Sequence, residues 1–278
     1  MRVQSPAKVN LHLEVLEKRP DGYHDIQTLM HRIDLMDEIE IRAEGEGIRL
    51  IADGEGVPGD ERNLIWKAAR LFCRETGAPE GFEIRCRKAI PAGAGLGGGS
   101  GNAASVLMAL NELLKTGAEE KFLMEMGARL GADVPFFIFR RPALARGKGE
   151  VLTPIAMPSP LWFLLLFPPF GISTAWAYET YDKMSPGKKT GTPIKDAYRS
   201  VGDLLPILKN DLELPAMCLH PEIGAMKEEM LRRGAAGALM TGSGSALFGL
   251  FAEEADARKA SRSIRVPAGW KTAVVKGI

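Results

Sequence analysis

The sequence predicts an α+β fold built from two domains. Stretches in which apolar residues recur with the period of two typical of strands are mixed with stretches of helical spacing, and the two kinds do not strictly alternate. A chain of 278 residues is long enough for one large domain or two packed ones. The segment "MPSP", residues 157–160, is the best boundary, so we expect domains over residues 1–155 and 156–278.

The first strand is predicted over residues 7–15, where apolar and polar side chains alternate. Its polar face carries Lys8 and Asn10, which therefore point the same way. The Pro-Asp-Gly sequence at residues 20–22 predicts a turn, and residues 33–43 predict a further strand.

Helical spacing follows over residues 63–77, which begin with Asn and end with Gly, the residue types that start and stop helices. Residues 82–90 predict a strand that leads into a glycine-rich loop. Two more helices are predicted over residues 102–114 and 119–131.

In the rest of the chain, two apolar runs at residues 136–139 and 161–167 predict buried strands, because they are far shorter than the roughly 20 residues that span a bilayer. The last third predicts a helix over residues 221–233, two strands joined by the turn "TGSGS", another helix and a closing strand. Residues 183–195 are rich in Gly, Pro and Lys, which predicts a mobile segment.

Composition excludes several classes of partner. The chain has 36 basic and 35 acidic side chains, and a net charge of +1 provides no overall field for nucleic acid or an anionic membrane. Three cysteines without metal-type spacing predict reduced thiols and a cytoplasmic protein, and the first residues lack the apolar core of a secretory signal. Any anionic ligand must therefore be bound locally.

The glycine-rich loop is the strongest functional signal, with six glycines between Gly93 and Gly101. Ordering so many glycines costs backbone entropy, and an ordinary strand-to-helix connection needs only about 2 to 6 residues. Consecutive glycines let several backbone N–H groups point inward, and a helix that begins near Asn102 adds its positive N-terminal end. The loop therefore predicts a binding site for phosphate groups.

Two better-known phosphate loops fit less well. Gly93, Gly95 and Gly98 satisfy the dinucleotide pattern G-x-G-x-x-G, but the glycines continue past the third one and no acidic residue ends a second strand about 20 positions on. A Walker-type loop requires G-K-[ST], and the lysine is missing.

The stretch "PAGAGLGGGSGNAAS" resembles the phosphate loop of the GHMP kinases, "SPAKVNLHLEV" resembles their first motif, and "MTGSGSALFGLF" resembles their third. The motifs occur in the family's order across nearly the whole chain. With "RPDGYHDIQTLM" and "LGADVPFF", the set is similar to the branch that phosphorylates cytidine diphospho-methylerythritol on its 2-hydroxyl, in the non-mevalonate route to isoprenoid precursors. The resemblance implies a two-domain GHMP-kinase fold with the active site in the inter-domain cleft.

The resemblance also implies roles for particular residues. Lys8 and Asp133 match the catalytic pair, while Asn10, Tyr23 and His24 match the substrate-binding residues, the last two recognising cytosine. ATP and Mg²⁺ are the implied cofactors, with Ser100 a candidate metal ligand. The adenine is expected near Asn63 and Lys88, and the remaining nucleotide-binding positions are Pro91, Gly93, Gly95, Leu96, Gly97, Gly98, Gly99, Ser100, Gly101 and Asn102. We expect a small-molecule substrate, no nucleic-acid or membrane partner, and a monomer or weak homodimer.

Simpler interpretations remain open beside these roles. Asp133 suits the N-cap of a helix, and both roles are compatible. Tyr23 and His24 could be a half-buried pair flanking a turn. Lys188, Lys189 and Lys195 are expected to form a solvated basic loop and not a lid. A kinase for another small alcohol, such as homoserine or mevalonate, and a non-catalytic nucleotide-binding regulator are the alternative functions.

Two positions depart from the family pattern. Gly101 stands where the family commonly has serine, so a hydroxyl is lost near the expected Mg²⁺ and β-phosphate. Ser245 stands where the third motif often has proline, which is expected to alter only the rigidity of the turn.

Overall fold

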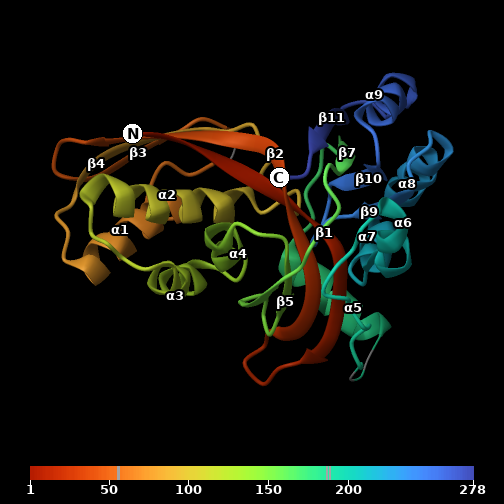
Figure 1. Ribbon diagram of the computed structural model, residues 1–278, viewed down its shortest axis with the longest axis horizontal. Coiled ribbons are helices and arrows are strands. Elements are labelled where there is room, and N and C mark those ends of the chain that lie inside the picture. The colour runs from red at the N-terminus through yellow and green to blue at the C-terminus, as the bar shows by residue number, and fades with distance from the viewer. Residues whose placement is uncertain (55–56, 186, 188) are drawn as a thin grey trace. The chain divides into compact units, whose positions relative to one another are not determined.

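The computed structural model describes residues 1–54, 57–185, 187 and 189–278, and it shows the predicted mixture of helices and sheets (Figure 1). The chain forms two compact units, which interleave along the sequence. Unit 1 consists of residues 1–7, 35–92 and 97–140, and unit 2 of residues 8–34, 93–96 and 141–278. The domain boundary expected after residue 155 stays a prediction.

Unit 1 is a sheet with four helices. Its strands are β3 (Gly47–Ala52), β4 (Gly81–Arg87), the last part of β2 (His24–Ala43) and the first residues of β1 (Arg2–Lys18), in the order β3-β4-β2-β1. The pairing of β4 with β2 is antiparallel, and that with β3 is parallel. The helices are α1 (Leu64–Thr76), α2 (Gly98–Leu114), α3 (Glu120–Leu130) and α4 (Val134–Phe139).

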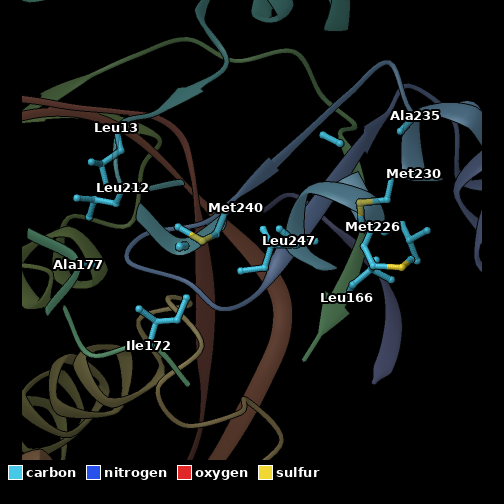
Figure 2. Packing of buried hydrophobic residues seen from close by; sticks show 14 of the residues in the cluster. Leu13, Leu166, Ile172, Ala177, Leu212, Met226, Met230, Ala235, Met240 and Leu247 are labelled. Carbon is cyan, nitrogen blue, oxygen red and sulfur yellow. The ribbon is translucent and has the colours of Figure 1, made fainter. Parts of the chain in front are cut away.

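Unit 2 contains the antiparallel sheet β11-β7-β10-β9, whose strands are β7 (Trp162–Phe167), β9 (Gly237–Met240), β10 (Leu247–Phe251) and β11 (Lys271–Lys276). Helices α8 (Glu222–Arg232) and α9 (Glu254–Ser263) pack on it. Leu166, Met226, Met230 and Leu247 belong to the apolar cluster that joins these helices to the sheet (Figure 2). The remaining elements are β5 (Ala143–Arg146), β6 (Val151–Pro154), α5 (Thr174–Met184), α6 (Val201–Leu204), the 3₁₀ turn Leu205–Ile207, β8 (Lys209–Asn210), α7 (Glu213–Leu219) and the longer parts of β1 and β2.

Local signals account for most helix ends. The Asn63 side chain accepts a hydrogen bond from the Ile65 backbone N–H at 2.9 Å and so caps α1, while Gly77 ends that helix with φ +70°. Asn, with its short polar side chain, satisfies an amide that the helix leaves unpaired, and Gly tolerates positive φ. Both ends of this helix are confirmed as predicted.

Two local predictions are wrong, and a third is met in part. Residues 136–139 lie in α4 and not in a strand, because a short apolar run cannot distinguish a buried strand from a buried helix, and Pro135 suits a first helical turn. The helix after the glycine loop begins at Gly98, one turn before Asn102. The expectation of a solvated basic loop is met in part: Lys195 is exposed, whereas the Lys189 side chain is 33% exposed and its ammonium contacts the Tyr181 hydroxyl. Lys188 lies outside the described residues.

Within the described residues, no helix combines the length and the apolar character that crossing a membrane requires.

The polar face of β1 is buried in unit 2. Glu14 is 4% exposed, and its carboxylate accepts hydrogen bonds from the Lys209 ammonium at 2.6 Å and from the Thr192 backbone N–H at 2.7 Å. Burial raises the pKa of Glu14, but these hydrogen bonds outweigh it and lower the pKa to about 2. The Glu14 carboxylate therefore helps to hold residues 189–192 and β8 against β1.

This depressed pKa makes folding stability depend on acid pH. Because the pKa of Glu14 is about 2 when folded and 4.5 in its ordinary state, its contribution is complete above about pH 4.5 and is lost as the pH falls toward 2. We expect Glu14→Gln to have a lower free energy of unfolding than wild type at pH 7. The difference in this free energy between the two proteins should shrink steadily as the pH falls from 5 to 3. Urea unfolding across this range measures the difference. Parallel pH profiles for the two proteins would contradict the prediction.

Candidate functional site

The N-terminus of α2 forms the unit 1 part of the glycine loop. Gly97 occupies the N-cap position with φ +69°, without a side-chain capping hydrogen bond in the described part of the chain. The first turn contains no acidic residue. The backbone N–H groups and the positive end of this 17-residue helix are therefore available to an anion, as a phosphate site requires.

Two glycines of this turn are required by close packing. A Cβ on Gly98 would lie 2.8 Å from the Ile90 Cγ2 and 3.2 Å from the Lys88 Nζ. A Cβ on Gly101 would lie 2.7 Å from the Pro6 carbonyl oxygen, closer than real Cβ atoms approach other atoms. The glycines thus serve close approach within and around a helix, whereas the sequence predicted that the glycine-rich loop continues to a helix that begins near Asn102.

The departure at Gly101 has a counterpart on β1. The Ser5 Oγ lies 3.2 Å from where a Cβ on Gly101 would be, and it has no hydrogen-bond partner among the described residues. A hydroxyl is therefore present beside this turn, on the neighbouring strand instead of the helix.

Asp133 lies at the N-cap position of α4 in unit 1. Its side chain makes no capping hydrogen bond to α4 in the described part of the chain, so that role for its carboxylate is not realised. Helix α4 packs against α2, and a Cβ on Gly131 would lie 3.9 Å from the Ser100 Oγ. The turn that carries Asp133 is therefore adjacent to the start of α2.

The residues fit a magnesium ion that is held mainly by phosphate groups. Among the described residues, no group of three or more His, Cys, Asp or Glu side chains is arranged to bind a metal. Mg²⁺ in nucleotide sites keeps several waters and uses one or two protein ligands with the phosphates, so it needs no such group. Ser100, in the first turn of α2, fits the part of a single oxygen ligand.

Asn63, Lys88 and Asn102 all have structural partners in unit 1. Besides capping α1, Asn63 donates to the Pro58 carbonyl oxygen at 2.7 Å. Asn102 is 3% exposed, and its amide contacts the Cys86 Sγ on β4, so it is turned toward the sheet. Lys88 is ion-paired with Asp37 beside Gly98. Pro91 lies just beyond this pair and is half-buried.

In unit 2, Lys8 and Asn10 form a buried hydrogen-bonded pair. The Lys8 ammonium donates to the Asn10 Oδ1 at 2.5 Å, and the Asn10 amide donates to the Thr28 Oγ1 at 2.8 Å. The Asn10 backbone N–H donates to the Thr241 Oγ1 at 2.9 Å. Lys8 and Asn10 are only 3% and 2% exposed. Their mutual hydrogen bond and the bonds of Asn10 to β2 and to the turn after β9 therefore hold the pair in place.

The beginning of the glycine loop lies against the third glycine-rich motif, also in unit 2. The Ala246 backbone N–H donates to the Ala94 carbonyl oxygen at 3.2 Å, and the Lys8 N–H donates to the Leu96 carbonyl oxygen at 3.0 Å. A Cβ on Gly95 would lie 2.1 Å from the Thr241 carbonyl oxygen. The three motifs, far apart in sequence, therefore meet through their backbones.

Ser245, where the family often has proline, does more than alter the rigidity of this turn. It is 1% exposed, and its hydroxyl donates to the Phe170 carbonyl oxygen. This contact ties the turn to the chain that follows β7, which a proline side chain could not do.

Tyr23 and His24 differ sharply in exposure. Tyr23 is 60% exposed, with the Lys148 ammonium 4.6 Å from its ring centroid. His24 is buried, stacks on Tyr178 at 4.8 Å between centroids, and donates from Nε2 to the Asp182 carboxylate at 2.8 Å. Burial raises the pKa of Asp182, but hydrogen bonds from Lys18 and His24 outweigh it and lower the pKa. The pair thus offers one open aromatic face and one fixed imidazole.

Sequence reasoning missed the partners that fix these residues. Asp37, Tyr178 and Asp182 lie in ordinary amphipathic segments, where nothing in the sequence marks them. Thr241 belongs to the recognised glycine-rich turn, so its place in that motif was the one available signal. Lys8 lies in unit 2 and Asp133 in unit 1, and their pairing stays a prediction.

Family models match two segments of the chain. Residues 63–141 match the N-terminal domain of the GHMP kinases, and residues 194–266 match the GHMP kinases C-terminal domain.

Full-length relatives carry a more specific name. The chain is 46% identical, over 100% of its length and 99% of the relative's, to a 4-diphosphocytidyl-2-C-methyl-D-erythritol kinase of Geobacter metallireducens. It is 42% identical to the protein of that name from Syntrophus aciditrophicus, over 100% and 99% of the two chains.

Solved structures agree with this similarity. A crystal structure of 4-(cytidine 5'-diphospho)-2C-methyl-D-erythritol kinase superposes with a TM-score of 0.84 at 36% identity, covering 100% of this chain and 99% of that one. A homoserine kinase from Cytophaga hutchinsonii gives a TM-score of 0.73 at 18% identity, covering 100% and 94% of the two chains, and shares the fold.

Proposed function

The chain belongs to the GHMP kinases, in the branch of the 4-diphosphocytidyl-2-C-methyl-D-erythritol kinases, and from that premise we propose how its residues carry out phosphoryl transfer. It is an ATP-dependent kinase of isoprenoid synthesis that phosphorylates 4-diphosphocytidyl-2-C-methyl-D-erythritol. The observation that carries this function is similarity to kinases of that name along the whole chain. The acceptor is the 2-hydroxyl.

Asp133 is the general base in this proposal. Phosphoryl transfer requires alignment and charge stabilisation more than covalent help, and its loose transition state releases the acceptor proton late. A carboxylate with an ordinary pKa near 3.9 can accept that proton. The position of Asp133 supports this role, because its turn lies beside the start of α2, where a Cβ on Gly131 would be 3.9 Å from the Ser100 Oγ.

Lys8 stabilises the negative charge that develops on the acceptor oxygen. Its ammonium is buried, and its hydrogen bond to Asn10 restricts it to one position. A preorganised cation in a site of low dielectric stabilises charge more strongly than a solvated one. Asn10, held by Thr28 and Thr241, positions Lys8 and contacts the substrate.

The ATP phosphates bind the backbone N–H groups at the start of α2, between Gly95 and Asn102, with the adenine near Asn63. Mg²⁺, with Ser100 as its one protein ligand, supplies neutralisation of phosphate charge when bound. This placement is supported by the N-terminus of α2, which has no side-chain capping hydrogen bond and no acidic residue in its described first turn.

The cytosine is recognised by Tyr23 and His24. The exposed Tyr23 ring provides a stacking surface, and the fixed His24 imidazole provides a hydrogen-bonding edge. Neither a kinase for homoserine or mevalonate nor a non-catalytic regulator is favoured, because neither agrees with the names of the full-length relatives.

We also propose a cytoplasmic protein that acts as a monomer or weak homodimer. All three cysteines are free, which agrees with a reducing compartment. The position of the active site in a cleft between the domains remains an expectation from the family resemblance.

The substrate assignment is tested by ADP release in the presence of Mg·ATP. Turnover with 4-diphosphocytidyl-2-C-methyl-D-erythritol, and at least 100-fold less with its cytidine-free phosphate, homoserine or mevalonate, is the expected result. Turnover with a small alcohol instead would keep the kinase chemistry and overturn the substrate. ATP binding without turnover on any of them would favour the regulator.

A further inference from the structure

Lys88 places a cation at the start of α2. Its Nζ lies 3.2 Å from the position of a Cβ on Gly98, the first residue of that helix, and its side chain is 11% exposed. Lys88 directly follows β4 and precedes Gly98 by ten residues, so its side chain contacts the helix that the chain enters after the intervening loop. The N-terminus of α2 is thus accompanied by a lysine ammonium.

A buried carboxylate fixes this ammonium. Asp37 is 0% exposed, its Oδ2 contacts the Lys88 Nζ, and its Oδ1 accepts the backbone N–H groups of Ala89 and Ile90 at 2.8 and 2.9 Å. These bonds hold the carboxylate and hence the direction of the lysine. The neighbouring Cys86 thiol is neutral at pH 7, because burial raises its pKa to about 11, so it does not compete for the ammonium.

The surroundings favour an anionic ligand. Asp37 offsets the charge of Lys88, but Lys88 lies beside the positive end of α2, and the first turn of that helix has no acidic residue. A Walker-type loop supplies its phosphate-binding lysine from the loop itself, and the corresponding lysine is missing between Gly93 and Gly101. Lys88 provides such a cation from the end of the preceding strand.

We propose that Lys88 binds the ATP phosphates beside Gly98, and that Asp37 is the positioning residue that directs it there. The inference rests on the proposed ATP-dependent function, and it assigns Lys88 to the phosphates, whereas the family resemblance gives it to the adenine.

The two roles are separated by binding measurements that need no turnover. We would titrate wild type and Lys88→Met with ATP, with adenosine and with inorganic tripolyphosphate, using calorimetry or NMR. We expect the affinities for ATP and tripolyphosphate to fall at least tenfold in the variant and the affinity for adenosine to change less than twofold. Lys88→Arg should keep most of the wild-type affinity for ATP and tripolyphosphate.

Either of two results would overturn the assignment: a loss of adenosine affinity equal to the loss of ATP affinity, or unchanged tripolyphosphate affinity. Because tripolyphosphate contains no base, it decides the question even where adenosine binds too weakly to measure. If wild type failed to bind ATP at all, the proposed function would fail and the assignment of Lys88 would fail with it, whereas ATP binding by wild type with unchanged tripolyphosphate affinity in Lys88→Met would overturn the assignment alone.

Folding of the variants is controlled in two ways. Lys88→Met leaves the buried Asp37 carboxylate without its cation. The double variant Lys88→Met/Asp37→Asn therefore removes both charges, while the Asn oxygen still accepts the hydrogen bonds from the backbone N–H groups of Ala89 and Ile90. Lys121→Met, on the exposed face of α3, removes a charge elsewhere and should bind all three ligands as wild type does.

The positioning role of Asp37 is tested by steady-state kinetics. Asp37→Asn alone should raise KM for ATP about threefold with unchanged kcat, and a fall in kcat alone would contradict its positioning role.

Discussion

Asp133→Asn is expected to lower kcat by about 10²- to 10⁴-fold while leaving the affinity for ATP within about twofold of wild type. The asparagine side chain has nearly the same shape as the aspartate but cannot take up the proton of the substrate's acceptor hydroxyl. Steady-state ADP release gives kcat, and calorimetry gives the ATP affinity of the same preparation.

The structure makes this variant a clean test of chemistry. Asp133 is half-buried and makes no capping hydrogen bond to α4 in the described part of the chain, so the substitution removes no cap. Urea unfolding of the variant beside wild type separates any change in the free energy of unfolding from the loss of turnover.

A matched control is Asp256→Asn on α9, an exposed aspartate at the start of a helix. It should keep wild-type turnover. If Asp133→Asn retained kcat within a factor of ten, the general-base assignment would be wrong. If it lost ATP affinity in proportion to kcat, Asp133 would act in nucleotide binding instead.

The fold could be predicted from the sequence where periodicity and end signals agree. The alternation over residues 7–15 and the Asn63 and Gly77 boundaries correspond to β1 and α1. The run at residues 136–139 failed because four apolar residues carry no period, and tertiary packing decides between strand and helix.

The site was predictable to a lesser degree. A phosphate loop could be inferred from the number of its glycines, but the physical need for each glycine could not, because it lies in contacts such as that of Gly101 with Pro6. Asp37 is separated from Lys88 by 51 residues, so only the folded sheet brings the pair together. Long-range partners of this kind leave no local pattern.

Among Gly→Ala substitutions in the glycine loop, Gly95→Ala is expected to disturb the structure most. Its Cβ would lie 2.1 Å from the Thr241 carbonyl oxygen, and the backbone has φ +77°, which disfavours any side chain. The turn at Thr241 must move, and Thr241 also accepts the hydrogen bond from the Asn10 backbone N–H. We therefore expect both instability and at least a 100-fold loss of kcat/KM.

Gly93→Ala separates the two causes. Gly93 has a similar φ of +69°, but a Cβ there would meet nothing within 4 Å. Both variants suffer the cost of positive φ, about 1 to 2 kcal/mol, whereas Gly95→Ala alone suffers the clash, which for overpacked sites costs about 1 to 3 kcal/mol more. Urea unfolding of the pair should give a difference of about 2 kcal/mol. Equal stability of the two variants would mean that the glycine is needed for its backbone angle alone, and that contact with the Thr241 turn does not determine the shape of the loop.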